Sequence, residues 1–282
     1  MTQHLVCLTF DFDAMSGLVA RGLTTPTPIS RGEFGAVAVP RILDLLKRHG
    51  IKASFFIPGA VFKTYPQLCE RIIEDGHEVG NHGWSHVPPS SLSRDEEEAG
   101  LQRSNELIKS LTGRQPAGYR SPSWDLGENT LELLIKHGFV YESSMMGHDY
   151  APYFVRQGDE VHADGSMTFG TPTSLIEMPI SWSLDDFPHF EFLRMENSVM
   201  QGLMNAESVL GNWTADYDYL RTRLDWGILT YTFHPYVIGR GHRMLILERL
   251  IQHLADNGAT FVTLESAVQR WLDRTGSAQQ ES

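Results

Sequence analysis

Residues 5–14 read LVCLTFDFDA. The first part of this stretch is an unbroken apolar run, which is typical of a strand buried on both faces, and the last part adds two acids, Asp11 and Asp13. Alternate side chains of a strand point to the same face, so the two carboxylates would project together and repel each other. We therefore expect a buried strand that brings two negative charges to a positive group at its end.

Strand and helix patterns alternate over the rest of the chain. We predict strands near residues 5–12, 52–58, 77–83, 117–124, 139–144, 175–182, 227–235 and 260–264, and helices near 37–50, 62–75, 93–111, 130–137, 215–226, 244–257 and 265–273. This alternation is typical of an α/β fold with mainly parallel strands, and a (β/α) barrel accommodates this many units better than an open sheet. Polar residues that directly follow the strands would then meet at the carboxyl-terminal rim of the barrel.

The composition favours one large domain. The chain has 282 residues, 41% of them hydrophobic, and a formal net charge of −12, which argues against a nucleic-acid or anionic-membrane partner. We expect one catalytic domain at residues 1–273 and a disordered tail at 274–282. The sequence shows no signal-peptide pattern and no long uncharged apolar run, and Cys7 and Cys69 fit buried thiols, so we expect a cytoplasmic protein.

Two histidines are candidate partners for the acids. His82 and His86 are four residues apart in NHGWSHVPP, a spacing that lets two imidazoles reach one cation. Alone, this spacing more often belongs to ordinary surface or core histidines. Together with an aspartate from a strand end, it predicts a His-His-Asp site with an open position for water, suited to zinc or a similar divalent ion. One aspartate would bind the ion, and the other would accept a proton from the water.

Five motifs, in the order LTFDFD, NHGWSH, YRSPSW, ISWSLDDF and LTYTFHP, resemble those of the polysaccharide deacetylase family, also called the NodB-homology family. The resemblance covers about residues 5–270. It implies a distorted (β/α) barrel of seven or eight mainly parallel strands and metal-assisted hydrolysis of a non-peptide amide bond. The TFDFD form and residues 31–46 resemble the subfamily that contains the Helicobacter-type peptidoglycan deacetylase, cyclic imide hydrolases and bacterial allantoinases.

The resemblance also implies roles for the residues of the predicted metal site. Asp11 matches the general base of the family. Asp13 takes the place of the metal aspartate, which in most of the family follows the base directly but is separated from it here by Phe12. His82 and His86 match the two metal histidines. The metal would be zinc, with cobalt, nickel or manganese as alternatives.

Further motif residues complete the implied active site. Arg120 matches the arginine that orients the base, and His234 matches the general acid. Asp185 or Asp186 would support His234, and the degenerate motif leaves the choice between them open. The oxyanion would be held by the metal and by a backbone N–H near Trp124.

Four residues are candidates for binding the substrate. Trp124 and Trp182 could form a platform, although tryptophans more often serve packing. Arg240 and His242, in GRGHR after the His-Pro turn, could bind an anionic or imide-like substrate, although loop charges are usually only solvated. The segment 14–32, predicted to be a loop, could be a lid or an oligomer contact.

The sequence leaves the substrate open between two classes. We favour a small cytosolic cyclic imide or ureide, because the sequence lacks an export signal and cell-wall polymer lies outside the cytosol. The alternative is N-deacetylation of N-acetylglucosamine residues in peptidoglycan or another glycan. A catalytically lost binding module and a metal-free hydrolase of the same fold are further alternatives. The resemblance also implies a homo-oligomer.

Overall fold

The computed structural model describes residues 3–195 and 197–280. Its strands are β1 (Gln3–Asp11), β2 (Ser54–Ile57), β3 (Glu78–Asn81), β4 (Gly118–Tyr119), β5 (Tyr141–Glu142), β6 (Tyr153–Gln157), β7 (Glu160–Val161), β8 (Met167–Thr168), β9 (Thr171–Glu177), β10 (Leu193–Arg194), β11 (Val199–Met200), β12 (Trp226–Phe233) and β13 (Ala259–Phe261). Its α-helices are α1 (Ser16–Ala20), α2 (Pro26–Arg48), α3 (Gly59–Thr64), α4 (Pro66–Glu74), α5 (Arg94–Thr112), α6 (Thr130–Lys136), α7 (Asp186–Phe190), α8 (Ala206–Arg223), α9 (Pro235–Ile238), α10 (Gly241–Asp256) and α11 (Leu264–Gln280).

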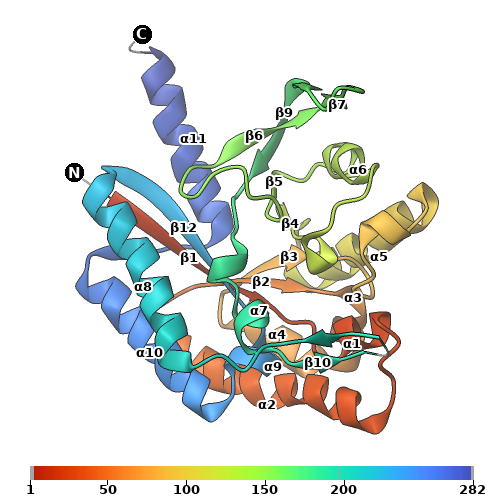
Figure 1. Cartoon of the computed structure of the whole chain (residues 1–282), viewed down its shortest axis with the longest axis vertical. Helices are drawn as coiled ribbons and strands as arrows, with labels where there is room; N and C mark the ends of the chain where they lie inside the picture. The colour runs from red at the N-terminus through yellow and green to blue at the C-terminus, as the bar shows by residue number, and fades with distance from the viewer. Residues whose placement is uncertain (1–2, 196, 281–282) are drawn as a thin grey trace.

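Within the described residues, nine strands form one sheet in the order β12-β1-β2-β3-β4-β5-β9-β6, with β13 also paired to β1 (Figure 1). Every pairing is parallel except that of β6 with β9. Two contacts bring the far side of the sheet back to β12. Asp185 forms a parallel bridge with Thr232, and the Ile228 N–H donates to the Tyr150 carbonyl at 2.9 Å. The sheet is thus curled into a distorted barrel, which confirms the predicted fold class.

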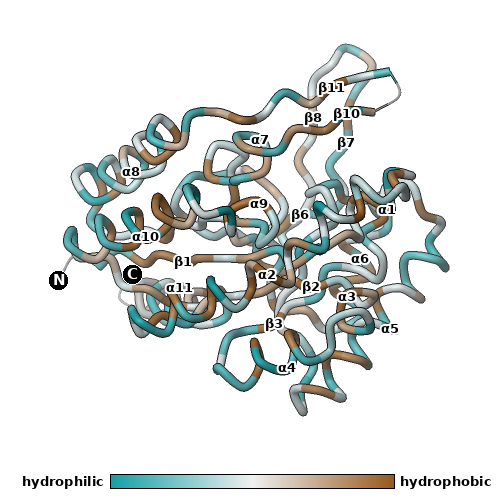
Figure 2. The backbone as a smooth tube through the Cα atoms, turned by 90° about the horizontal axis from the view of Figure 1, so that it is seen from below, coloured by the Kyte–Doolittle hydropathy of each residue, from teal (hydrophilic) through white to brown (hydrophobic). Residues whose placement is uncertain are grey.

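Side chains of β1 alternate between two hydrophobic clusters. Leu8 points outwards and packs in the cluster that contains the buried face of α2. Leu5 and Cys7 point the other way, into a cluster that includes Trp271 of α11. Figure 2 shows β1 as a largely hydrophobic segment that runs beside α11. Asp11 continues the same side as Leu5 and Cys7. The strand therefore fills part of the barrel interior with apolar side chains and carries Asp11 to its carboxyl-terminal end.

The segment 14–32 differs from the loop that the sequence predicts, because most of it is helical. α1 starts at Ser16, and α2 starts at Pro26 rather than near residue 37. Proline suits a first helical turn, since its fixed φ fits the helix and its missing N–H is not needed there. Gly32 lets α2 pass close to the end of β1: a Cβ on Gly32 would lie 2.4 Å from the Met15 Cα.

Other helix boundaries also differ from the sequence prediction. The helix expected at 62–75 is divided into α3 and α4 before Pro66, and α8 begins at Ala206, capped by Asn205, rather than near residue 215. The tail expected at 274–282 continues α11 as far as Gln280, because a helix already formed gains one hydrogen bond per added residue; residues 281–282 lie outside the described residues. Among the described residues, none of the helices combines the length and apolar character that a bilayer crossing requires.

Candidate metal centre and active site

Asp13, His82 and His86 converge at the carboxyl end of the barrel. Asp13 lies two residues beyond β1; its Oδ1 is 3.3 Å from His82 Nε2, and its Oδ2 is 3.1 Å from His86 Nε2. All three side chains are buried, and one potential ligand atom from each lies within 4.8 Å of the others. The three residues that the sequence predicts as metal ligands therefore form one cluster.

The segment after β3 orients the two imidazoles. The Nδ1–H of His82 donates to the Arg120 carbonyl at 2.7 Å, which directs Nε2 into the cluster. The Asn81 side chain accepts a hydrogen bond from the Gly83 N–H at 2.8 Å and stabilises the turn that carries His82. His86 then has a φ of 60°, a conformation that non-glycine residues rarely adopt. Strain of this kind is common at functional sites.

The cluster has the donor set of a divalent metal site. Asp13 Oδ1 and His82 Nε2 are buried without a hydrogen-bond partner. Burial acts to raise the pKa of Asp13, but His86 and His82 outweigh it and hold this pKa well below its usual value, so the group is a carboxylate. Two imidazole nitrogens and one carboxylate suit zinc and similar divalent ions. The residues present therefore fit the ion that the sequence predicts.

Asp11 lies beside the cluster and pairs with Arg120. The Arg120 Nη1 donates to Asp11 Oδ1 and to Thr9 Oγ1, both at 2.8 Å. Its Nε and Nη2 donate at 3.0 Å to the carbonyl and hydroxyl oxygens of Ser143. The second oxygen of Asp11, Oδ2, is 3.9 Å from His82 Nε2. One carboxylate oxygen of Asp11 is thus held by a fully buried arginine, while the other faces the metal cluster.

His234 directly follows β12, and its ring lies beside Asp13 of the cluster. Its Nε2 is 3.8 Å from Asp13 Oδ2, and its Nδ1–H donates to Asp186 Oδ1 at 2.8 Å. Asp185 Oδ1 is 3.4 Å from the same Nδ1, so Asp186 is the nearer partner. Asp185 Oδ1 also accepts the Phe187 N–H in the first turn of α7. Burial acts to lower the pKa of His234, but Asp185 and Asp186 outweigh it and raise this pKa well above its usual value.

The three residues of the metal cluster, together with Asp11 and His234, line one pocket of about 450 Å³. Trp124 and Trp182 stack at its edge with ring centroids 4.2 Å apart, and Trp182 is 44% exposed. The pocket is also lined by Arg21, directly after α1, by Met200 of the β10–β11 hairpin and by Gln201, which follows the hairpin. The sequence pointed to the two tryptophans but not to the other three residues, because Arg21 lies in a segment predicted to be a loop and the hairpin carries no motif.

The turn before Trp124 is also strained. Ser123 and Trp124 have φ values of 60° and 55°, and Ala14 beside Asp13 has a φ of 48°. The Trp124 N–H donates to the Ser121 carbonyl at 2.9 Å. This particular N–H is therefore occupied and is not the free donor that an oxyanion would require.

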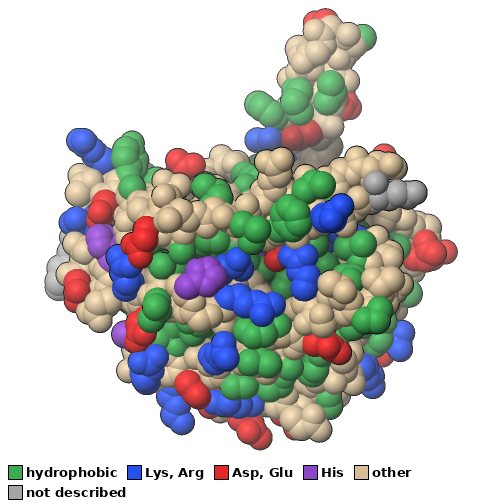
Figure 3. All heavy atoms as spheres, turned by 60° about the horizontal axis from the view of Figure 1, so that its bottom comes forward, with side chains coloured by type: hydrophobic (Ala, Val, Ile, Leu, Met, Phe, Trp, Pro, Cys, Tyr) green, Lys and Arg blue, Asp and Glu red, His purple; other side chains and the backbone are tan. Residues whose placement is uncertain are grey.

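Arg240 and His242 lie away from the pocket of His234. Arg240 stacks on Phe34 of α2, with its guanidinium carbon 3.6 Å from the ring centroid. His242 lines a separate hollow beside Leu245 of α10. Figure 3 shows basic side chains among hydrophobic ones on the face that includes these helices. The structure does not bring the two residues to the site, because α9 carries the chain from His234 to the outer surface.

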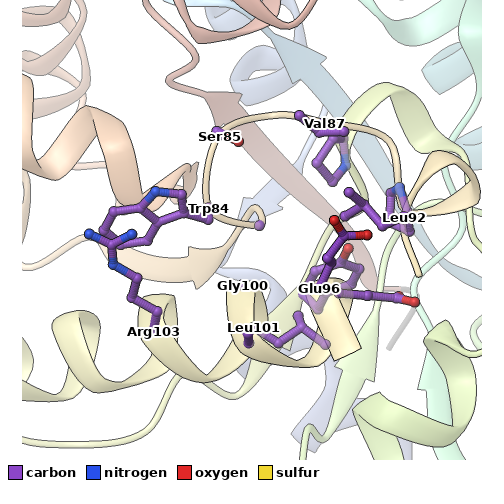
Figure 4. A pocket seen from close by; sticks show the side chains of 14 residues that line it. Trp84, Ser85, Val87, Leu92, Glu96, Gly100, Leu101 and Arg103 are labelled. Atoms are coloured by element: carbon purple, nitrogen blue, oxygen red, sulfur yellow. The ribbon is translucent and has the colours of Figure 1, made fainter. Parts of the chain in front are cut away.

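A second cavity, of about 320 Å³, lies between the segment after His82 and α5 (Figure 4). Arg103 of α5 lies over the Trp84 indole, 3.5 Å from the ring centroid. Glu97 also lines this cavity, but its free Oε2 atom is hidden from solvent. None of the described residues of the metal cluster lines this second cavity. The candidate metal ligands lie in the pocket of His234 instead.

Comparison with known proteins agrees with this geometry. The family model for polysaccharide deacetylases matches residues 1–141. A peptidoglycan deacetylase of Helicobacter pylori is 36% identical over 286 residues, which cover 96% of this chain and 97% of that protein. This chain belongs to the polysaccharide deacetylase family. Polysaccharide deacetylases are metal-dependent hydrolases of amide C–N bonds, and this chain is a hydrolase of that class.

Solved structures show the same fold. A protein from Mycobacterium smegmatis described as a polysaccharide deacetylase matches with a TM-score of 0.84 at 28% identity, covering 97% of this chain and 92% of the other. The Puue allantoinase matches with a TM-score of 0.77 at 18% identity, covering 96% of this chain and 91% of the other. At that identity the allantoinase supports the fold alone. The polysaccharide deacetylase barrel therefore extends over nearly the whole chain.

Proposed function

We propose that this polysaccharide deacetylase family member hydrolyses a ring amide of a small cyclic imide or ureide at the centre formed by Asp13, His82 and His86. The main observation in support of a hydrolytic site is that this cluster lies in the same pocket as Asp11 and His234. A carboxylate and a protonated imidazole on either side of a metal site form the acid–base pair that amide hydrolysis needs. The proposal includes a cytoplasmic location and a homo-oligomer, which cell fractionation and light scattering would test.

The proposed mechanism assigns a step to each buried group. A divalent ion, most simply zinc, would polarise the substrate carbonyl and lower the pKa of a water molecule there to about 7. Asp11 accepts the proton of the attacking water, and the hydrogen bond from Arg120 holds its carboxyl group in position. His234 donates a proton to the departing nitrogen, and Asp186 holds its ring with Nε2 towards the pocket.

The walls of the pocket support a small, flat substrate. Arg21, directly after α1, and Met200 of the β10–β11 hairpin line the pocket. The stacked Trp124 and Trp182 present a flat aromatic surface at the edge. Planar imide and ureide rings can stack on such a surface, and Arg21 can donate hydrogen bonds to their carbonyl oxygens.

N-deacetylation of N-acetylglucosamine in peptidoglycan or another glycan is the second candidate. It is favoured by the 36% identity, over nearly the full length, to the Helicobacter pylori protein named as a peptidoglycan deacetylase. The same groups would serve this reaction, since an acetamide is also cleaved at a carbonyl with release of a protonated amine. The two candidates differ in the substrate that the pocket walls admit, not in the acid–base groups.

A parallel turnover screen separates the two candidates. Zinc-loaded protein is incubated with succinimide, hydantoin, allantoin and chitin oligomers, with Asp11→Asn as the inactive control. Ring opening without acetate release supports the small-molecule proposal. Acetate release from the oligomers without ring opening replaces it with glycan deacetylation. Activity that survives complete removal of metal would overturn the metal-assisted mechanism for both.

A further inference from the structure

Two buried acids lie side by side near the segment that holds Arg120, and neither of them is a candidate metal ligand. Glu142 of β5 and Glu177 of β9 are direct neighbours in the parallel ladder, and both are fully buried. Ionising both of two neighbouring buried carboxyl groups costs free energy, because the two negative charges repel each other and neither is solvated. The proposed reaction gives neither acid a role.

The hydrogen bonds distinguish the two acids. Both oxygens of Glu142 accept from Ser144: Oε2 from the backbone N–H at 3.0 Å and Oε1 from the hydroxyl. Glu177 Oε1 accepts the Met145 N–H at 3.0 Å, whereas Glu177 Oε2 is buried without a partner as long as it carries no proton. A proton on Oε2 would let Glu177 donate to Glu142. Burial and the neighbouring Glu142 raise the pKa of Glu177 well above its usual value, which agrees with this placement.

Glu142 also fixes the segment that supports the active site. Its bonds to Ser144 fold the chain around Ser143, whose carbonyl and hydroxyl oxygens hold Arg120. The hydroxyl of Ser144 accepts the Ser121 N–H at 2.8 Å, at the start of the strained turn that lines the pocket. One carboxylate is thus connected both to the arginine that holds the base and to the wall beside the base.

We propose that Glu142 and Glu177 hold one proton between them, carried by Glu177, and that this acid pair is a positioning unit for Arg120 and for residues 121–124. The positioning role rests on the proposed reaction, whereas the shared proton does not. Neither residue contacts substrate. The unit acts through Ser143 and Ser144, so its loss would misplace groups that are used in the transition state and would leave the metal ligands in place.

Conservative glutamine variants test the division of roles. Glutamine at 177 replaces a protonated acid by a neutral donor and acceptor, so Glu177→Gln should retain kcat within about twofold. Glutamine at 142 presents an NH2 group where a Ser144 donor must bind. Glu142→Gln should therefore lower kcat by about 10- to 100-fold, with KM and zinc affinity unchanged. Equal losses of kcat in the two variants, or full kcat in Glu142→Gln, would overturn the proposal.

Infrared spectroscopy tests the shared proton without any turnover. The metal-loaded wild-type protein should show the carbonyl band of a buried protonated carboxylic acid, and Glu177→Gln should remove that band. Absence of the band in the wild-type protein would refute the shared proton even if no substrate were found in the screen. If the screen fails and the band is present, the proposed function fails alone.

Ser144→Ala provides a second variant in case Glu142→Gln does not fold. It removes the acceptor of the Ser121 N–H and leaves both acids in place. We expect kcat about tenfold lower, an unchanged infrared band and an unchanged zinc affinity. Wild-type kcat in Ser144→Ala would show that the acid pair does not act through this segment.

Discussion

Asp11 and Asp13 have different partners although only Phe12 separates them. Asp13 faces two imidazoles, whereas Asp11 is held by an arginine through one oxygen. The intervening residue turns its ring to the outer core and leaves both carboxylates on the inner side. The two acids can therefore serve different functions, one towards a metal ion and one towards a proton.

Replacement of each acid should separate these functions. Asp13→Ala removes one of three ligands, so zinc binding measured by equilibrium dialysis should be lost. Asp11→Asn keeps the ligands and removes the base, so zinc should stay bound while kcat falls by about 10² to 10⁴. Full activity of Asp11→Asn would show that another group accepts the proton.

His234 should set the alkaline limit of activity. The group acts while protonated, so activity is lost as pH rises through its pKa, and the nearby acids raise this pKa. Asp186→Asn should lower the pKa of His234 and move the alkaline limb of the kcat profile to lower pH. Asp164→Asn, which removes an exposed acid before β8, is the matched control and should leave the limb in place. An unmoved limb in Asp186→Asn would argue against His234 as the acid.

At the scale of elements, α2 is fitted to the end of β1 through a glycine. A Cβ at Gly32 would meet the backbone of Met15, two residues beyond Asp13, at 2.4 Å. The backbone cannot rotate away as a long side chain can, so either α2 or the segment that follows β1 must move. The segment 14–32, which looked like a separate loop, is therefore part of the support of the metal centre.

Gly32→Ala should destabilise the fold by about 1–3 kcal/mol and weaken zinc binding. Gly211→Ala is the matched control, because no atom lies within 4 Å of its Cβ position in α8 and alanine favours a helix by up to about 1 kcal/mol. Denaturant unfolding and zinc titration of both variants measure these effects. Equal stability of Gly32→Ala and the wild type would mean that α2 does not constrain the end of β1.

At the scale of the whole molecule, the candidate metal centre joins distant parts of the barrel. Its ligands come from the ends of β1 and β3, and His234 adds β12 from the far end of the chain. An ion that binds only the folded arrangement must stabilise the whole barrel, because unfolding separates its ligands.

Metal removal should therefore lower the melting temperature. Zinc at about 100 times its Kd contributes about 2.7 kcal/mol, which corresponds to about 5 °C or more for a chain of this size. EDTA should lower the melting temperature of the wild-type protein by that amount and leave Asp13→Ala unaffected. An equal response of the two proteins to EDTA would place the metal elsewhere.

The sequence by itself determined the parts of this protein that depend on local pattern. The apolar run before Asp11 predicted a buried strand, and the helical pattern from residue 93 predicted α5, which the structure shows capped by Ser93 and Glu96. The spacing of His82 and His86 and the five ordered motifs predicted the barrel and its ligands. Such features depend on residues that are close in the sequence, so periodicity, spacing and the resemblance of short motifs to a known family reveal them.

Only the tertiary structure decided the features that depend on pairing between distant residues. Asp186 rather than Asp185 lies nearest His234 because the bridge of Asp185 to β12 sets their register. Arg21 enters the pocket wall because α1 folds over the barrel rim. Glu142 and Glu177 meet because β5 and β9 pair in parallel. Local patterns carry no information about such contacts, since the burial and charge of each group depend on a partner chosen by the packed barrel.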